Sequence, residues 1–167
     1  MIRCVIVEDE EMARGVLKSL LAQYCQDVMV CAEADDVNSG RMIIEAYRPD
    51  LVFLDIEMPG GGGFKLLNSM ENHNFEVIFT TAYEQFAIKA IRHDALDYLL
   101  KPIDPKELVA AVEKVKEAKY KKSLEKQYDN ILKNLDPEQL VVRKISLSTT
   151  DKIHLIDVDD IIRCESD

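Results

Sequence analysis

The sequence predicts an α/β fold, namely a doubly wound parallel sheet of five strands with helices on both faces. Short, continuously apolar runs alternate with segments of helical periodicity through about residue 117. Such runs are typical of parallel strands that helices cover on both faces. From about residue 118 the chain becomes Lys-rich and polar, and a strand pattern follows it. We therefore expect a helical linker and then a few β-strands of an incomplete all-β domain.

The expected strands share a short apolar run that ends at or just before a polar residue. They are RCVIV (3–7), VMVCAEA (28–34), LVFL (51–54), VIFT (77–80) and DYLL (97–100). Helices are expected between these strands, where apolar residues recur at helical spacing. The first helix carries Met12, Val16, Leu17, Leu20, Leu21 and Tyr24, and the second carries Val37, Gly40, Ile44 and Tyr47. Two more helices are expected near 64–72 and 84–93. Pro105 opens the fifth helix, at a first-turn position that suits proline.

The segment KYKKSLEKQYDNILKNL (119–135) keeps a helical apolar stripe and is expected to continue the fifth helix until the Asp-Pro at 136–137. We expect a first domain over residues 1–120, a helical linker over 121–137 and part of a second domain over 138–167. The last part reads as two or three strands with a turn near Thr150–Asp151. About 30 residues are too few for an independent β-domain, so these strands are expected to be disordered or to pair between chains.

Composition excludes several classes of function. The 167 residues carry a net charge of -10, and an acidic chain is a poor nucleic-acid binder because phosphate neutralisation needs clustered Lys and Arg. No apolar run approaches the roughly 20 residues of a membrane span, and the N-terminus does not resemble a signal peptide. We expect a cytoplasmic protein with no membrane partner.

Polar side chains follow four of the expected strands at the point where each strand ends. Glu8 and Asp9 follow the first strand, Asp55 the third, Thr81 the fourth and Lys101 the fifth. The reactive crevice of an open α/β sheet lies outside the carboxyl ends of its strands. If these strands are neighbours, three carboxylates, a hydroxyl and an ammonium group meet at one small site.

Crowded carboxylates repel each other, and a hard divalent cation offsets that cost. Mg²⁺ prefers oxygen ligands and usually takes one or two carboxylates together with a substrate phosphate. A carboxylate beside such an ion can act as a nucleophile and form an acyl phosphate, while a lysine and a hydroxyl hold the other oxygens of the transition state. The residue types therefore indicate phosphoryl transfer onto an aspartate.

Taken singly, most of these residues also have an ordinary structural interpretation. Glu8 and Asp9 could be charges at the N-terminus of the first helix, Lys101 a solvated loop lysine, and Thr81 the cap of a strand. Asp55 differs, because a carboxylate at the end of a buried strand is costly unless something satisfies it. Four such coincidences at one sheet edge favour a site.

The segments CVIVEDE, LVFLDIEMPG, FTTAYE and DYLLKP closely resemble the four signatures of response-regulator receiver domains of two-component signalling. The resemblance covers about residues 1–120 and implies a flavodoxin-like sheet with strand order 2-1-3-4-5. It further implies that Asp55 is the phospho-acceptor and that Asp9 binds Mg²⁺ directly. Glu8 matches the acid that reaches the metal through water, and the backbone carbonyl of Glu57 matches the third protein ligand.

The same resemblance assigns roles to three residues on the last two strands. Lys101 matches the lysine that binds the phosphoryl group, and Thr81 matches the switch hydroxyl. Tyr98 matches the aromatic side chain that rotates inward when the threonine moves, although a half-buried strand aromatic is its ordinary interpretation. The implied partners are a sensor histidine kinase and, on phosphorylation, a second copy bound through the 4-5-5 face (fourth helix, fifth strand, fifth helix). The implied chemistry is self-phosphorylation and autodephosphorylation only, so the protein is not expected to be an enzyme in the usual sense.

Two further segments resemble response regulators of the LytTR type. EQFAIKAIRHDALDYLLKPID (84–104) is similar to receivers joined to LytTR-type DNA-binding domains, and ISLSTTDKIHLIDVDDIIRCESD (145–167) is similar to the opening strands of such a domain. The resemblance implies transcription regulation through promoter DNA by the full-length protein. The elements that would enter DNA grooves are expected beyond residue 167, so no DNA-contacting residue is assigned.

Two other classes of function remain open at this point. A phosphatase of the haloacid-dehalogenase type also uses a strand-end aspartate, but it needs a second aspartate two residues on, where this chain has Glu57, and its nucleophile usually follows the first strand. A receiver fold can also serve as an interaction module that is never phosphorylated. Nothing essential to the site is missing here.

The four glycines at 60–63 separate into two pairs in our interpretation. Gly60 and Gly63 fit a tight turn beside the phosphorylation site, whereas Gly61 and Gly62 look like local variations. Receivers of this kind usually carry a small polar residue where this chain has Gly62, and such a residue would be a natural N-cap for the third helix. We expect a looser loop with unchanged chemistry. No Lys-Ser/Thr follows, so the run is not a nucleotide-binding loop.

Overall fold

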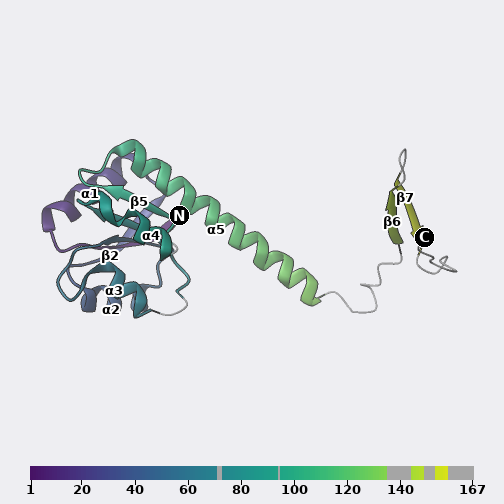
Figure 1. The fold of residues 1–167 in the computed structure, drawn as a ribbon, viewed down its shortest axis with the longest axis horizontal. Helices are drawn as coiled ribbons and strands as arrows, with labels where there is room; N and C mark the ends of the chain where they lie inside the picture. Colours follow the sequence, from purple (N-terminus) through teal and green to yellow (C-terminus); the bar gives the residue numbers. More distant parts are fainter. Residues whose placement is uncertain (71–72, 94, 135–143, 149–152, 158–167) are drawn as a thin grey trace. The chain divides into compact units, whose positions relative to one another are not determined.

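The fold is built on a parallel sheet whose strand order follows the expected pattern. The computed structural model describes residues 1–70, 73–93, 95–134, 144–148 and 153–157. Its five-stranded sheet has the order β2-β1-β3-β4-β5, with every pairing parallel (Figure 1). The strands are β1 (Ile2–Val7), β2 (Val28–Ala34), β3 (Leu51–Asp55), β4 (Glu76–Thr81) and β5 (Asp97–Leu100). The predicted fold class and strand order are confirmed.

Helices cover both faces of this sheet. They are α1 (Glu11–Tyr24), α2 (Val37–Tyr47), α3 (Gly62–Asn68), α4 (Ala87–Arg92) and α5 (Pro105–Asn134), with a short 3₁₀ helix η1 (Glu84–Phe86) before α4. Buried residues of α1 and α5 share one apolar core, and those of α2, α3 and α4 share the other. Figure 1 shows α2 and α3 on the side of the sheet away from α5. Among the described residues, no helix combines the length and the apolar content that a membrane crossing requires.

Strand β3 shows why the strands read as unbroken apolar runs. Side chains alternate between the two faces of a strand, and both faces are covered here. Leu51 and Phe53 belong to the core beneath α1 and α5, while Val52 and Leu54 belong to the opposite core. Every residue of β3 is buried, including Asp55 at its end. A buried strand therefore delivers a carboxylate to the edge of the sheet.

The helical faces agree with the expected patterns only in part. In α1, Leu17 and Leu21 are buried, but Met12 is 85% and Val16 55% exposed. The helix expected from this spacing is present, but the spacing does not show which part of the apolar stripe faces the sheet. Tyr24 is half exposed for the same reason.

The third and fourth helices are shorter than the sequence suggested. Helix α3 begins at Gly62 and ends at Asn68, whereas 64–72 was expected, and residues 71–72 lie outside the described part. The segment expected as one helix over 84–93 is divided into η1 and α4. Both are short elements, and their ends are the least predictable feature of a helix.

The glycine run is more constrained than expected, so the interpretation of Gly61 and Gly62 as local variations was wrong. Gly60, Gly61 and Gly62 all have positive φ, at 95°, 115° and 77°, in the region that favours glycine. A Cβ on Gly62 would also meet the carbonyl oxygen of Ile56, and one on Gly63 would meet the carbonyl oxygen of Asp55. Gly61, not residue 62, is the N-cap of α3, so a polar side chain at 62 would not cap this helix. The run lets the backbone pass close to the end of β3.

Helix α5 runs without interruption from Pro105 to Asn134 and so includes residues 121–134 of the expected linker. The described residues of 1–122 form one compact unit. Two further strands, β6 (Lys144–Ser148) and β7 (Ile153–Asp157), pair with each other antiparallel, as the strand pattern predicted. The expected turn near 150–151, the helix end at 136–137 and the segment after 157 lie outside the described residues. The domain limits remain predictions, as do the pairing between chains and the disorder expected beyond 137.

Two glycines in helices provide a matched test of the packing of α2 on the sheet. A Cβ on Gly40 would lie 2.7 Å from Cγ1 of the buried Val7, whereas one on Gly15 in α1 would meet nothing within 4 Å. We expect Gly40→Ala to lower the free energy of unfolding by about 1–2 kcal/mol, because the clash outweighs the gain in helix propensity. Gly15→Ala should raise it by about 0.5–1 kcal/mol. Urea unfolding of both variants checks this, and a Gly40→Ala chain as stable as Gly15→Ala would contradict the packing described.

Candidate functional site

The strand register brings the predicted site residues together at the carboxyl edge of the sheet. Val7 pairs with Leu54, so the residues that follow β1 lie beside the end of β3. Asp55 pairs with Thr80, and Thr81 pairs with Leu100, directly before Lys101. The four strands therefore end side by side, and Glu8, Asp9, Asp55, Thr81 and Lys101 meet there as expected.

Lys101 is the centre of this group. Its Nζ lies 2.8 Å from Oδ2 of Asp55 and 2.6 Å from Oε2 of Glu8. Both carboxylates are buried, at 3% exposed for Glu8 and 5% for Asp55. The backbone N–H of Lys101 donates to the carbonyl oxygen of Thr81 at 2.8 Å, which fixes the residue at the end of β4. One ammonium group thus joins two acids that come from β1 and β3.

Backbone N–H groups hold the other carboxylate oxygens. The N–H of Glu57 donates to Oδ1 of Asp55 at 3.2 Å, and that of Glu10 donates to Oε1 of Glu8 at 3.4 Å. Arg14 of α1 donates from Nη1 to the carbonyl oxygens of Glu8 and Asp9, which orients the turn between β1 and α1. Sequence reasoning missed Arg14, whose only signal was a cation on the first turns of α1.

The acids of the site can hold a hard metal ion. Ligand oxygens of Glu8, Asp9 and Asp55 all lie within 4.8 Å of one another, and Asp9 is exposed. The donors are oxygens only, with no thiolate or imidazole, and this donor set suits Mg²⁺. Glu57 lines the same hollow as these acids, where its carbonyl was expected. The residues present therefore fit the Mg²⁺ that the sequence implied.

Burial and charge shift the protonation of this cluster. Burial is the largest influence on Glu8, and with the negative charge of Asp55 it raises the pKa of Glu8 from 4.5 to about 7, although Lys101 opposes the shift. Burial works against the charged form of Lys101, but hydrogen bonds to Asp55 and Glu8 outweigh it and raise the pKa of Lys101. Without a metal, the site keeps its lysine charged and holds one carboxyl close to protonation at neutral pH.

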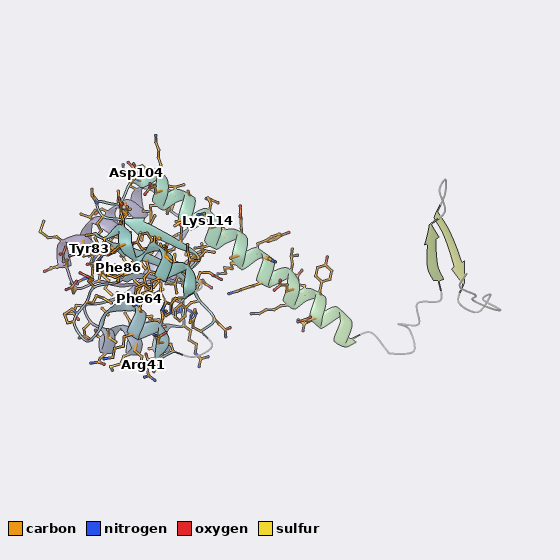
Figure 2. The ribbon with its side chains drawn as sticks, in the orientation of Figure 1. Arg41, Phe64, Tyr83, Phe86, Asp104 and Lys114 are labelled. Atoms are coloured by element: carbon orange, nitrogen blue, oxygen red, sulfur yellow. The ribbon has the colours of Figure 1, made fainter. Side chains whose placement is uncertain are left out.

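Two hollows meet at the acids and give access to them. One, of about 660 Å³, contains Asp55, Thr81 and Lys101 and extends along α1 past Met12 and Val16. The other, of about 530 Å³, shares Asp9 and Glu57 with the first. It is bounded by aromatic side chains, with Phe64 and Phe86 at a ring distance of 6.3 Å (Figure 2).

Thr81 and Tyr98 are linked through Tyr83, a residue that sequence reasoning did not single out. Thr81 is fully buried, and its Oγ1 accepts a hydrogen bond from the N–H of Tyr83 at 3.3 Å. The hydroxyl of Tyr98, on β5, donates to the carbonyl oxygen of Tyr83. Burial, together with the charge of Glu84, raises the pKa of Tyr98. Tyr83, in the loop after β4, therefore links the two predicted switch residues.

Curated relatives resemble this chain along most of its length. A sensory transduction protein LytT from Bacillus cereus is 34% identical over 164 residues, covering 97% of this chain and 65% of the relative. The transcriptional regulatory protein BtsR from Salmonella typhi is 32% identical over 163 residues, covering 96% of this chain and 64% of the relative. The chain thus spans somewhat less than two thirds of the length of these relatives.

Solved structures share the fold of the first domain. A DNA-binding response regulator of the LuxR family from Staphylococcus aureus matches with a TM-score of 0.63 and 32% identity, covering 69% of this chain and 98% of that one. The REC domain of AraT, a response regulator from Geobacillus stearothermophilus, matches with a TM-score of 0.65 and 30% identity over 73% of this chain and 98% of its own. Residues 4–113 match the response regulator receiver domain family. By sequence and by fold, the chain belongs to the response regulator receiver domain family of two-component signalling.

Proposed function

We propose that this receiver accepts a phosphoryl group on Asp55 from the phosphohistidine of a sensor histidine kinase, with Mg²⁺ bound by Glu8, Asp9, Asp55 and the carbonyl of Glu57. The observation that carries the proposal is the position of Lys101 Nζ, within 2.8 Å of Asp55 and 2.6 Å of Glu8. A lysine held there can bind a phosphoryl oxygen as soon as the transfer begins. The hollow of about 660 Å³ gives the donor access to Asp55.

The transfer forms one bond and breaks another. A carboxylate oxygen of Asp55 attacks phosphorus, the P–N bond of the phosphohistidine breaks, and the imidazole leaves with the electron pair and is then protonated. Lys101 binds one oxygen of the phosphoryl group, and the Thr81 hydroxyl lies at the same sheet edge to bind another. Bound Mg²⁺ neutralises the crowded carboxylates and the phosphoryl oxygens. Glu8 remains ionised beside the metal.

The signal leaves the site through the loop after β4. In our proposal Thr81 turns towards the phosphoryl group and gives up its contact with the N–H of Tyr83, which moves the carbonyl that Tyr98 binds. Tyr98 then rotates inward and changes the 4-5-5 face of α4, β5 and α5. Ile88 and Ile91 on α4 are 69% and 73% exposed, which supplies apolar surface for a homodimer there.

We assign the full-length protein to transcription control in the cytoplasm. The relatives named LytT and BtsR, and the antiparallel pair β6–β7, support a following LytTR-type DNA-binding domain. Promoter DNA is then a partner of the full-length protein, and the receiver itself performs only self-phosphorylation and autodephosphorylation. The phosphatase alternative is disfavoured, because Asp55 ends β3 and not β1, and Glu57 stands where the general acid would be.

Phosphorylation of Asp55 is tested with a small phosphodonor. Incubation of the chain with acetyl phosphate and Mg²⁺ should add the mass of one phosphoryl group, and Asp55→Asn should abolish the gain, because the amide is not a nucleophile. Asp129→Asn, on the exposed surface of α5, is the matched control and should be modified like the wild type. Intact-protein mass spectrometry measures this, and an unmodified wild-type chain would sink the proposal.

Mg²⁺ binding distinguishes a working site from a receiver fold that serves only for interactions. Mg²⁺ at 100 times its Kd should raise the free energy of unfolding by about 2.7 kcal/mol, since the ion binds only the folded chain. Asp9→Asn should remove most of this gain, and Asp35→Asn, an exposed acid outside the cluster, should keep it. Urea unfolding with and without Mg²⁺ measures both. Equal curves for the wild type would favour the interaction module.

The raised pKa of Glu8 predicts a pH dependence of stability without metal. Because the folded pKa of about 7 lies above the ordinary value of 4.5, the folded chain binds the proton more tightly than the unfolded chain. The Glu8 contribution is therefore complete below about pH 4.5 and is lost as pH rises to about 7, with a total on the order of 3 kcal/mol. Glu8→Gln in EDTA should flatten the unfolding free energy across this range. Parallel pH profiles of variant and wild type would show that this assignment is wrong.

A further inference from the structure

Within the compact unit of residues 1–122, one face of α5 carries apolar side chains first and lysines after them. Positions 108, 112, 115, 119 and 122 recur at intervals of four and three residues, so they share one face of the helix. Leu108, Val112 and Val115 are buried against the sheet. The next two positions on the same face are Lys119 and Lys122. The face that anchors the helix thus passes from apolar to cationic after Val115.

The cationic part of this face, together with the adjacent Lys116, is held by ion pairs. Each lysine meets an acid that stands just before a strand or opens it, at the edge of the sheet opposite the acidic site. The pairs are Lys116–Asp27 at 2.6 Å, Lys119–Asp50 at 2.7 Å and Lys122–Glu76 at 2.7 Å. They fasten the helix to the starts of β2, β3 and β4.

The Lys119–Asp50 pair is reinforced by further hydrogen bonds to the backbone. Asp50 Oδ2 accepts both Lys119 Nζ and the backbone N–H of Arg3, and the same Nζ lies 3.3 Å from the carbonyl oxygen of Met1. Partial burial opposes ionisation of Asp50, but these hydrogen bonds outweigh it, so the pKa of Asp50 is lowered. Helix α5, β1 and the start of β3 therefore meet at one charged contact.

No apolar anchor supports these pairs. Among residues 116–130 of α5, no side chain is buried, and the side chains of Lys119 and Lys122 are 47% and 52% exposed. Half-exposed ion pairs are weak individually and are screened by salt, whose Debye length falls from about 8 Å at 0.15 M to about 3 Å at 1 M. Residues 116–122 are consequently attached to the domain by contacts that salt can release, unlike residues 108–115.

We propose that residues 116–122 form an ionic clasp that sets where α5 leaves the receiver domain. The clasp opens without disturbing the apolar anchor at Leu108, Val112 and Val115, so the last two turns of the helix within the compact unit detach as a separate step. This step depends on ionic strength. The clasp is a conformational device at the end of the sheet remote from the acids.

Amide hydrogen exchange tests the clasp in the chain of residues 1–167. Between 50 mM and 1 M NaCl, exchange of the wild-type segment 116–122 should accelerate several-fold, while segment 108–115 should change little. In Lys119→Gln/Lys122→Gln the segment should already exchange faster at 50 mM NaCl, by up to about fivefold for each pair lost. Salt should then have a smaller effect, because only Lys116 remains paired.

A matched control removes the same charge from the same helix but leaves the three ion pairs of the clasp intact. Lys106→Gln/Lys121→Gln replaces two exposed lysines of α5 and should exchange like the wild type at both salt concentrations. The clasp is refuted if exchange of 116–122 in the wild type is independent of salt, or if the two double variants behave alike. Equal acceleration of segment 108–115 would also overturn it, since the helix would then open as one unit.

Discussion

The functional edge of the sheet depends on one partly buried ammonium group, the Nζ of Lys101, which lies between the carboxylates of Asp55 and Glu8. Three acids from β1 and β3 converge there, and two of them are almost inaccessible to water. Without a cation, such a cluster would leave uncompensated charge in a poorly solvated place. Lys101 supplies part of the compensating positive charge, and a metal ion held by the acids would supply more. The same ammonium group therefore compensates two buried carboxylates and lies where, in our proposal, it binds an oxygen of the phosphoryl group.

The parallel sheet makes this arrangement possible because all its strands end at the same edge. Apolar side chains on both faces hold β1, β3 and β4 rigidly, so the acids stand on supported backbone and not on loose loops. The glycine run then turns the chain sharply away from Asp55 and keeps backbone, without side chains, close to the acceptor. At the opposite edge of the sheet, the ion pairs of the clasp join residues 116–122 of α5 to the starts of β2, β3 and β4. The acidic site and the ionic clasp thus lie at opposite ends of the same strands.

Much of the fold and of the site could be predicted from the sequence, for reasons that particular residues make clear. LVFL followed by Asp55 shows a strand buried on both faces that ends in a carboxylate. Resemblance supplied the strand order in which only β4 separates β3 from β5, so that the long side chain of Lys101 reaches Asp55. What could not be predicted depends on contacts that the apolar and charge patterns of the sequence do not show. Arg14 donates to the backbone carbonyl oxygen of Glu8, and Tyr83 contacts Thr81 through its own backbone N–H. The Asp36–Ser39 capping box of α2 departs from the usual Ser/Thr-to-Glu pattern. The constraint on Gly62 comes from the carbonyl of Ile56, which no local pattern contains.

The central claim is that Asp55 itself becomes the acyl phosphate, and the chemistry of that bond tests it most directly. Borohydride reduces an aspartyl phosphate to homoserine, whereas it leaves free carboxylates and phosphate esters of serine, threonine and tyrosine unchanged. After phosphorylation and reduction of the chain, peptide mass spectrometry should find homoserine at position 55 and at no other aspartate. Homoserine at Asp9 or elsewhere, or its absence from a chain that had gained a phosphoryl group, would contradict the account.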